Sequence, residues 1–529
     1  MIRVRQIKVE VKKDSFEEVR KKTIQKLKIK NQDLKDLTIV KQSIDARDKK
    51  NIMYIYEVDC SIVNEDKLLK LNKNDVLKVE NENYKKPDCG NIPLKNRPIV
   101  IGAGPCGLFA TLILAEAGYK PILFERGERV EDRQSSVEQF FKRGKLNVNS
   151  NVCFGEGGAG TFSDGKLGTL VSDKENRIKK VINTFIECGA PIEISYVNKP
   201  HIGTDVLRDV IINLRNKILS LGGDICYYST LTDIVVDDDK ISKIVINDNK
   251  KVDCDVLVLA LGHSARDTIK MLYNHGVKME GKPFSVGVRI QHKQEMINKS
   301  QYADFKDILP PASYKLTHKA KNGRGVYTFC MCPGGYVVNS SCEEGHLIVN
   351  GMSYHKRDSE NANSAVVVTV GPNDFGKKPL DGIDYQRRLE SLAFRKGNGK
   401  IPIQLWKDYR DNKIGNKFGS IKPVFKGKYT FANLNEIFPF YINEALKEGI
   451  MAFDKKIKGF ASDDAILASV ESRTSSAVRM IRGEDFVSSI YGIYPAGEGA
   501  GYSGGITTSA VDGIKVAEKI IEKYSKESL

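Results

Sequence analysis

The chain has 529 residues, of which 41% are hydrophobic, so it is long enough for about three to four domains. Its formal net charge is +16, and no apolar run approaches the roughly 20 residues that cross a bilayer. The N-terminus lacks the apolar core of a signal peptide, so we expect a soluble cytoplasmic protein. The ten cysteines do not suggest a disulfide scaffold, and neither they nor the seven histidines show metal-binding spacing, so we expect no metal site.

The first elements along the chain form a small unit of their own. Ile2–Val11 alternates like a strand with a slip near Gln6, and Ser15 with Glu18 forms a capping box before a helix. One helical face then carries Phe16, Val19, Thr23 and Leu27. Two strands, a short helix and a last strand follow at 37–44, 51–62, 65–72 and 75–80. The order βαββαβ predicts a ferredoxin-like domain over residues 1–92, with a polar linker at 81–96.

Residues 1–97 hold 24 lysines and arginines against 16 acidic residues, which is half of the net charge. A lysine-rich, solvated surface explains this excess, and a polyanionic partner explains it as well. Tyr54 and Tyr56 share one face of a predicted strand, where RNA-binding versions of the fold stack bases. The sequence lacks the Lys-Gly-aromatic pattern of those versions, so we favour a packing or interface role and keep RNA binding as an alternative.

The next elements form a dinucleotide-binding unit. A short apolar strand over 98–101 precedes Gly102, Gly104 and Gly107, a helix follows from about Pro105, and a second strand ends at Glu125. A strand before G-x-G-x-x-G, a helix after it and an acid about 20 residues later predict a pyrophosphate site at the helix N-terminus. The acid would accept hydrogen bonds from ribose hydroxyls. This segment alone fits either NAD or FAD.

Three further glycine-rich segments extend the pattern. The run over 153–168 is too polar for a core and too rich in glycine for a helix, so its amides would form a nest for phosphates. A second apolar strand ends at Gly262, and the segment 496–505 precedes a last helix. The residues we predict to bind the cofactor are Gly102, Ala103, Gly104, Pro105, Cys106, Gly107, Glu125, Arg126, Gly157, Gly158, Ala159, Gly160, Thr161, Ser163, Gly262, Gly497, Glu498, Gly504, Gly505 and Ile506.

Together with their order, these segments resemble the bacterial FAD-dependent, or NAD(FAD)-utilising, dehydrogenases of the two-dinucleotide-fold superfamily. The runs "GEGGAGTFSDGKL", "FCMCPGGYVVNSS", "ESRTSS" and "AGEGAGYSGGI" carry the resemblance. It implies bound FAD, with Glu498 at the ribitol and the last helix directed at the flavin, but no known substrate. Leu261 departs from the threonine usual before the glycine at 262.

The fold class that follows is α/β, a Rossmann-like FAD-binding domain with an inserted α+β substrate domain after the ferredoxin-like unit. We assign 93–280 and 460–529 to the two parts of the FAD-binding domain and 281–459 to the substrate domain.

We expect an FAD-dependent oxidoreductase of a small organic molecule. No second G-x-G-x-x-G is present, so NAD(P)H would act as a transient donor beside the flavin. Candidate catalytic residues are Lys166, Cys330, His355 and Arg473. Two other readings stay open, namely an FAD-containing protein that binds or modifies RNA and an assembly protein in which FAD is structural.

Overall fold

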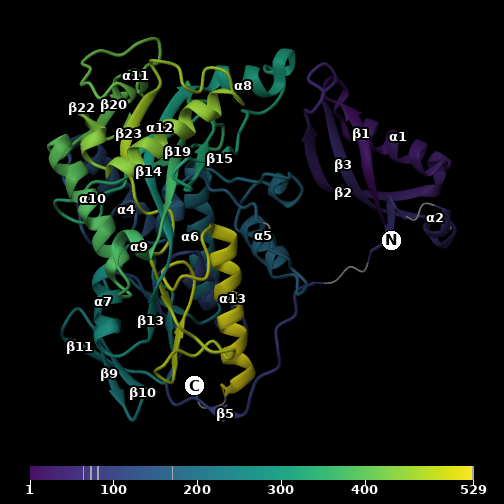
Figure 1. The fold of residues 1–529 in the computed structure, drawn as a ribbon. Helices are drawn as coiled ribbons and strands as arrows, with labels where there is room; N and C mark the ends of the chain where they lie inside the picture. The colour runs from purple at the N-terminus through teal and green to yellow at the C-terminus, as the bar shows by residue number, and fades with distance from the viewer. Residues whose placement is uncertain (64, 72–73, 80–82, 170, 527–529) are drawn as a thin grey trace.

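The computed structural model describes residues 1–63, 65–71, 74–79, 83–169 and 171–526, and the predicted linker at 81–96 and helix at 65–72 lie partly outside these ranges. Figure 1 shows an N-terminal unit that stands beside a larger body, to which the chain connects through a long extended segment. None of the helices in the described part of the chain combines the length and apolar character that a membrane span requires.

The N-terminal unit is an antiparallel sheet with the strand order β2-β3-β1-β4 and two helices. Its elements are β1 (Ile2–Glu10), α1 (Phe16–Leu27), β2 (Leu34–Asp45), β3 (Met53–Ile62), α2 (Glu65–Leu71) and β4 (Val76–Lys78). The predicted slip in the first strand is a bulge between Val4 and Ile7, where Gln6 has φ +55°. Ser15 caps α1 by accepting from the Glu18 amide, as expected, but Phe16 is 50% exposed and lies off the buried helix face.

The N-terminal unit contacts the body through a strand edge, a small apolar cluster and two lysines, Lys49 bound to the Ser300 carbonyl and Lys12 over the Phe305 ring. The Gln42 amide of β2 donates to the Tyr196 carbonyl at 2.7 Å, and the Asn198 amide returns a hydrogen bond to Gln42 at 2.9 Å. Val11 and Ile52 pack against Leu309 of the body, and all three are buried. The unit is therefore docked on the body with a core of its own.

A five-stranded parallel sheet with the order β25-β12-β6-β7-β8 lies at the centre of the nucleotide-binding part. Its strands are β6 (Ile99–Ile101), β7 (Ile122–Phe124), β8 (Asp224–Cys226), β12 (Leu257–Leu259) and β25 (Ile493–Pro495). Its two central helices are α3 (Pro105–Glu116), which follows β6, and α13 (Ile506–Lys523), which follows β25. The carboxyl ends of neighbouring parallel strands meet at one edge of the sheet, where ligands bind in this class of fold.

Close packing of α3 on its surroundings requires glycine at two positions. A Cβ on Gly107 would lie 1.8 Å from the Gly102 carbonyl oxygen, so only glycine lets α3 approach the turn after β6. A Cβ on Gly513 would lie 2.1 Å from the Cys106 carbonyl oxygen, so α13 crosses α3 at the same close range. The second contact packs α13, the helix that follows the last glycine segment, against the first glycine segment.

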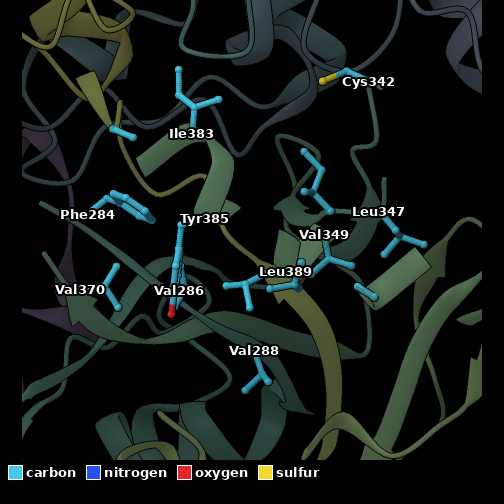
Figure 2. Close-up of a cluster of buried hydrophobic side chains, with 14 of the residues drawn as sticks. Phe284, Val286, Val288, Cys342, Leu347, Val349, Val370, Ile383, Tyr385 and Leu389 are labelled. Carbon is cyan, nitrogen blue, oxygen red and sulfur yellow. The ribbon is translucent and has the colours of Figure 1, made fainter. Parts of the chain in front are cut away.

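The second part of the body is a seven-stranded sheet with the order β15-β16-β19-β14-β23-β20-β22. Its strands are β14 (Phe284–Lys293), β15 (Thr317–Lys319), β16 (Gly325–Cys332), β19 (Asn361–Val370), β20 (Ile401–Leu405), β22 (Tyr429–Phe431) and β23 (Ile466–Glu471). Figure 2 shows the apolar side chains of β14, β18 and the helix α10 packed together in its core. β23 belongs to this sheet, so the sheet continues beyond the boundary expected at residue 459.

The remaining elements cover these sheets. They are β5 (Ile92–Pro93), α4 (Val130–Arg143), α5 (Arg177–Glu187), α6 (Thr204–Ser220), β9 (Leu231–Asp237), β10 (Lys240–Ile246), β11 (Lys250–Asp253), α7 (Arg266–Asn274), β13 (Met279–Gly281), α8 (Gln294–Tyr302), β17 (Tyr336–Asn339), β18 (Val349–Met352), α9 (Pro372–Phe375), α10 (Asp381–Gly397), α11 (Trp406–Arg410), β21 (Phe425–Lys426), α12 (Phe440–Asp454), β24 (Val478–Met480) and β26 (Tyr524–Ser525). β5 pairs with β26, so the end of the predicted linker is held against the C-terminal helix.

Candidate functional site

Three of the glycine segments, 102–107, 153–168 and 496–505 with the Ile506 that follows it, meet at the N-terminus of α3, and we call them the first, second and last segments. The Gly157 amide donates to the Ala103 carbonyl at 2.8 Å, which joins the second segment to the first. A Cβ on Gly160 would contact Ile506 at 3.2 Å and Pro105 at 3.9 Å, so all three segments lie within contact of one point. A small cavity there is lined by Pro105, Gly157, Gly160 and Ile506 together with apolar side chains.

Four glycines at this edge of the sheet have no explanation within the chain. At Gly262 and Gly504 a Cβ would meet nothing within 4 Å, and at Gly104 and Gly505 the nearest atoms lie 3.9 and 3.8 Å away. None of the four has a left-handed φ, so neither backbone conformation nor packing demands glycine there. A group outside the chain that approaches the backbone closely would account for glycine at these positions, as the pyrophosphate does in dinucleotide turns.

The carboxylate of Glu125 is already bound by three backbone amides. Its Oε2 accepts from Ala103 at 2.7 Å, and its Oε1 accepts from Gly127 and Gly155 at 2.9 Å each. A carboxylate offers about four acceptor positions, so Glu125 keeps capacity for a further donor. Its neighbour Arg126 pairs with Asp267 at 2.9 Å, and its guanidinium lies over the Phe154 ring.

A buried arginine that the sequence did not indicate holds the second glycine segment in shape. Arg133 of α4 is fully buried and donates to the carbonyls of Asn151, Val152, Gly155, Glu156 and Gly158. Burial lowers the pKa of this guanidinium to about 10, which leaves it charged at neutral pH. The predicted nest is therefore a short 3₁₀ turn, Gly158–Phe162, in which Thr161 and Phe162 are buried and Ala159 is exposed, and Arg133 binds the carbonyl of its first residue.

The loop after β25 is held by a second ion pair. The Gly497 amide donates to Asp512 of α13 at 2.7 Å, and Arg482 pairs with the same carboxylate at 2.7 Å. Glu498 stays free of this pair, and its Oε1 lies 3.2 Å from Nδ1 of His263. Burial raises the pKa of the Glu498 carboxyl, but His263 and Lys282 outweigh burial, and the pKa is lower than usual.

Next to the glycine segment lies a cluster of thiols and charged groups, which we call the thiol cluster and define as Asp164, Lys166, Arg289, Cys330, Cys332, Arg357 and Glu471. Lys166 Nζ lies 3.2 Å from the buried Asp164 carboxylate and 3.9 Å from Sγ of Cys332. Arg357 also pairs with Asp164, from 193 residues away in the chain. Leu167, the residue after Lys166, accepts from Thr507 in the first turn of α13 at 2.7 Å, so the cluster adjoins the meeting point of the glycine segments.

His355 stacks on His201 beside the thiol cluster, with ring centroids 5.3 Å apart. Its Nδ1 pairs with the Ile202 carbonyl at 2.9 Å, and its amide donates to Asp205 at 2.8 Å. Burial and the charge of Arg357 lower the pKa of His201 to about 4. Three of the four catalytic candidates, Lys166, Cys330 and His355, are therefore neighbours.

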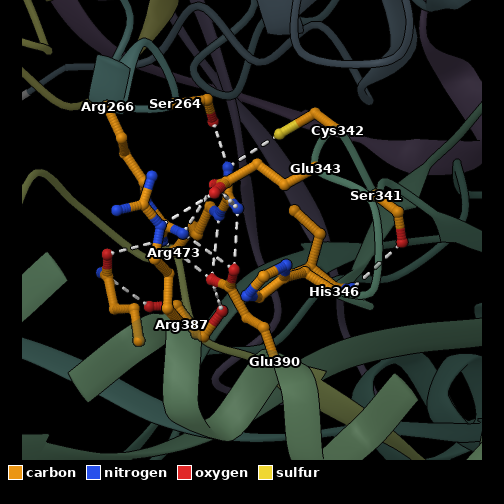
Figure 3. Close-up of polar contacts among 12 residues, drawn as sticks. Ser264, Arg266, Ser341, Cys342, Glu343, His346, Arg387, Glu390 and Arg473 are labelled. Carbon is orange, nitrogen blue, oxygen red and sulfur yellow. Dashed lines mark hydrogen bonds and ion pairs between the residues drawn. The ribbon is translucent and has the colours of Figure 1, made fainter. Parts of the chain in front are cut away.

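The fourth candidate, Arg473, lies in a separate buried network (Figure 3). Its guanidinium pairs with Glu390 at 2.8 Å and with Glu343 at 2.9 Å, and Arg266 binds the same two carboxylates. It also lies 2.8 Å from Sγ of Cys342, whose thiol is a hydrogen-bond partner of Cys153 at the start of the second glycine segment. Arg473 therefore joins the nucleotide-binding part to the seven-stranded sheet, and its charge is neutralised within the network.

A pocket of about 190 Å³ lies at the start of α13. Its lining combines the turn residues Tyr502, Ser503 and Gly504 with Thr507 and Thr508 of the helix and the segment 171–178. Arg177 and Lys515 add positive charge and Asp173 adds negative charge to its wall. The helix N-terminus faces this pocket, where its unpaired amides favour an electron-rich group.

The aromatic pair on β3 of the N-terminal unit does not offer an RNA-stacking platform. Tyr56 is 2% exposed, and its hydroxyl donates to Asp14. Tyr54 packs with the small cluster that joins the unit to the body at Leu309. Both tyrosines are therefore packing residues, and no comparison supports the RNA alternative.

The comparisons with known proteins give family matches for two parts of the chain and distant likenesses to solved structures. Residues 283–474 match the family described as FAD-dependent protein, C-terminal domain-like, and residues 1–61 match a domain of unknown function. Among solved structures, the chain is similar to E. coli quinol fumarate reductase (12% identity, TM-score 0.36, 82% of this chain and 70% of that one). It is also similar to L-proline dehydrogenase from P. horikoshii (13% identity, TM-score 0.33, 83% and 96%). Both likenesses are too distant to carry an argument about activity.

A much nearer relative is an uncharacterised protein of Clostridium beijerinckii, 49% identical over 519 residues, which make up 97% of each chain. This chain and the Clostridium beijerinckii protein belong to one family, and in this chain residues 283–474 carry the C-terminal domain of FAD-dependent proteins.

Proposed function

We propose that this protein binds FAD and is an FAD-dependent oxidoreductase of a small organic substrate. The observation that carries the proposal is the set of four glycines, Gly104, Gly262, Gly504 and Gly505, whose Cβ positions are open although no backbone strain requires glycine. They lie at the carboxyl edge of the parallel sheet, which is where a dinucleotide binds in such folds. The match of residues 283–474 to the FAD-dependent family supports the same cofactor.

The residues present fit FAD in kind. The N-terminus of α3 and the amides of Gly157–Thr161 would hold the pyrophosphate, and Glu125 would add a ribose hydroxyl to its three amide donors. Glu498 would bind the ribityl chain, and the N-terminus of α13 would face the pyrimidine end of the flavin. Arg126 would contact the cofactor through the guanidinium it places over Phe154.

A bound flavin supplies hydride or single-electron transfer, and the protein supplies binding, orientation and charge. Lys166 and Arg357 present two cations around Asp164 beside the meeting point of the glycine segments, so they would orient an anionic or polarised substrate. Asp164 is buried, so little water screens its attraction to Lys166 and Arg357, and this attraction is stronger than it would be at the surface. We assign NAD(P)H the role of a transient donor because the chain has one dinucleotide turn.

We read the N-terminal unit as ferredoxin-like, from its βαββαβ order and its β2-β3-β1-β4 sheet. Its role would be docking on the body, since Tyr54, Val11 and Ile52 face the contact with Leu309.

A single added methyl group tests the cofactor proposal. In Gly104→Ala the new Cβ meets the chain only at 3.9 Å, so the apoprotein should fold and melt as the wild type does. The methyl group would occupy the space of the pyrophosphate, so FAD affinity, measured by quenching of flavin fluorescence on titration, should fall at least about tenfold. The matched control is Gly371→Ala, where the Cβ is equally open and φ is −144°, far from the sheet edge.

Two results would contradict the proposal. One is a purified protein that is colourless and takes up no FAD on reconstitution. The other is an equal loss of FAD affinity in Gly104→Ala and Gly371→Ala, because that would show a general effect of the added methyl. A donor screen in the stopped flow then sorts NADH, NADPH and dithionite by the rate at which they bleach the bound flavin.

A further inference from the structure

We propose that Cys330 and Cys332 form a redox-active thiol pair and that the substrate class of the site is a small disulfide. The substrate assignment rests on the proposed FAD-dependent oxidoreductase function, whereas the thiol pair itself does not. Both cysteines lie at the end of β16, on the side of the seven-stranded sheet that adjoins the glycine segments.

The backbone of β16 is bent where the two cysteines lie. On a regular strand, residues i and i+2 are about 6.6 Å apart, from a rise of about 3.3 Å each. A disulfide needs Cβ atoms about 3.8 Å apart, so an undistorted C-x-C strand cannot close one. Here the register shifts between Phe329 and Cys332, Cys330 has φ +44°, and the Cys332 thiol donates to the Cys330 carbonyl at 3.4 Å, so β16 bends back on itself between the two cysteines.

The conformation of Cys330 is itself unusual. A non-glycine residue in the left-handed region is uncommon, and such strain gathers at active sites where the surroundings hold it in place. The Cys330 carbonyl accepts from Arg289 Nη1 at 3.2 Å, and the same nitrogen donates to Asn363 at 2.6 Å. Arg289 is a fully buried side chain of β14, so its hydrogen bond to Cys330 holds the bend of β16 in place.

Charges around the pair favour a thiolate. Lys166 Nζ lies 3.9 Å and Arg289 Nη1 lies 4.0 Å from Sγ of Cys332. The facing carboxylates are already paired, Asp164 with Lys166 and Arg357, and Glu471 of β23 with Arg289. The hydrogen bond from Cys332 lowers the pKa of Cys330 well below its usual value, burial opposes this, and Lys166 and Arg289 add to the lowering.

The two cysteines differ in solvent exposure, and this difference assigns them different roles. Cys330 is partly exposed, whereas Cys332 is buried. Cys330 is therefore the group that a substrate can reach, and Cys332 is the group that resolves the product within the protein. Lys166, on the glycine segment that α13 holds through Leu167, connects the pair to the proposed cofactor site.

The electrons and atoms balance as follows. The Cys330 thiolate attacks one sulfur of a disulfide, forms a mixed disulfide and releases the other half as a thiolate. The Cys332 thiol loses its proton and attacks Cys330, which closes the protein disulfide and releases the second half as a thiol. The substrate has gained two electrons and the one proton of Cys332, and the thiolate released first takes a proton from water. Reduced flavin would supply the two electrons that, with one proton, return Cys330 to the thiolate and Cys332 to the thiol.

The test uses the full chain and oxidised glutathione, followed by blocking with N-ethylmaleimide and peptide mass spectrometry. The wild type should form the Cys330–Cys332 disulfide, and Cys332→Ser should trap glutathione on Cys330. Cys330→Ser should give neither product. The control Cys89→Ser, at an exposed cysteine far from the cluster, should match the wild type. Equal melting temperatures show that each variant is folded.

A second readout addresses Lys166. In Lys166→Met the thiolate loses a neighbouring cation, so the pH at which Cys330 becomes half-alkylatable by iodoacetamide should rise by about one unit. Glutathione attached to Cys332 or Cys153, no internal disulfide, or a pH profile of alkylation that Lys166→Met leaves unchanged would each overturn the thiol pair. These readouts do not involve flavin, so the thiol pair can stand if FAD binding fails. FAD binding can equally stand if the thiol pair fails.

Discussion

Glu390 shows how much a single buried residue depends on its partners. It has no exposed surface, lies on α10, and accepts from both Arg266 and Arg473 at 2.8 to 2.9 Å (Figure 3). Burial raises the pKa of this carboxyl, but the two arginines outweigh burial and hold the pKa well below its usual value. The negative charge of Glu390 is thus favourable only while the guanidinium groups of both Arg266 and Arg473 stay beside it.

Glu390→Gln should destabilise the protein by about 3–5 kcal/mol at pH 7, because it removes the fully buried one of the two carboxylates that the buried Arg266 and Arg473 share. The pKa of a glutamate in the unfolded chain is about 4.3. Because the folded pKa is lower, the wild type has this stability in full above that pH and loses it as the pH falls toward the folded value. Urea unfolding from pH 7 to pH 3 should show that the difference in unfolding free energy between the wild type and Glu390→Gln becomes smaller as the pH falls.

Glu344→Gln, at an exposed neighbour of the same network, should change the unfolding free energy by less than about 0.5 kcal/mol at every pH. A difference in unfolding free energy between wild type and Glu390→Gln that stays constant from pH 7 to pH 3 would mean that the pKa of Glu390 is not lower in the folded than in the unfolded state.

At the scale of elements, α4 serves as the support of the second glycine segment. Arg133→Met keeps the length of the side chain but removes a charged donor from five carbonyls, of which those of Asn151, Val152 and Gly158 lose the donor that Arg133 supplies and those of Gly155 and Glu156 keep the Gly158 amide and the Thr161 hydroxyl, so the free energy of unfolding should fall by at least about 3 kcal/mol. Hydrogen exchange of residues 151–163 should quicken, and urea unfolding gives the energy. Arg143→Met, exposed on the last turn of the same helix, is the control and should shift stability by less than about 0.5 kcal/mol. Unchanged exchange in Arg133→Met would show that the segment holds its shape without α4.

The elements nearest the glycine motif were predictable because their signals are local. The strand expected over 98–101 is β6, Ile99–Ile101, and the helix expected from Pro105 is α3, Pro105–Glu116. Arg133 was not predictable, since its partners are carbonyls, which leave no trace in the residue types. The pair Asp164–Arg357 was hidden for another reason, because 193 residues separate its members and two sheets must form before they meet.

At the scale of the whole molecule, the N-terminal unit and the body depend on a small contact. Leu309→Asp places a charge in the cluster with Val11 and Ile52, where Leu309 is 6% exposed, so the unit should undock while each part keeps its own core. Small-angle scattering should then report a larger radius of gyration. Ile308→Asp is a matched control, because Ile308 is 48% exposed and should leave the radius unchanged. An unchanged radius in Leu309→Asp would mean that the pairing of Gln42 with Tyr196 and Asn198 is enough to hold the unit.

The strand that closes the parallel sheet is separated from its neighbour by more than two hundred residues, since β12 ends at Leu259 and β25 begins at Ile493. During synthesis, β12 must therefore wait with an unpaired edge while the whole seven-stranded sheet is made. Unpaired edges invite pairing with other chains, so this interval is when a nascent chain would be most dependent on chaperones. A ribosome that stalls in the second sheet would release a fragment with its first glycine turn complete and no α13 to close over it.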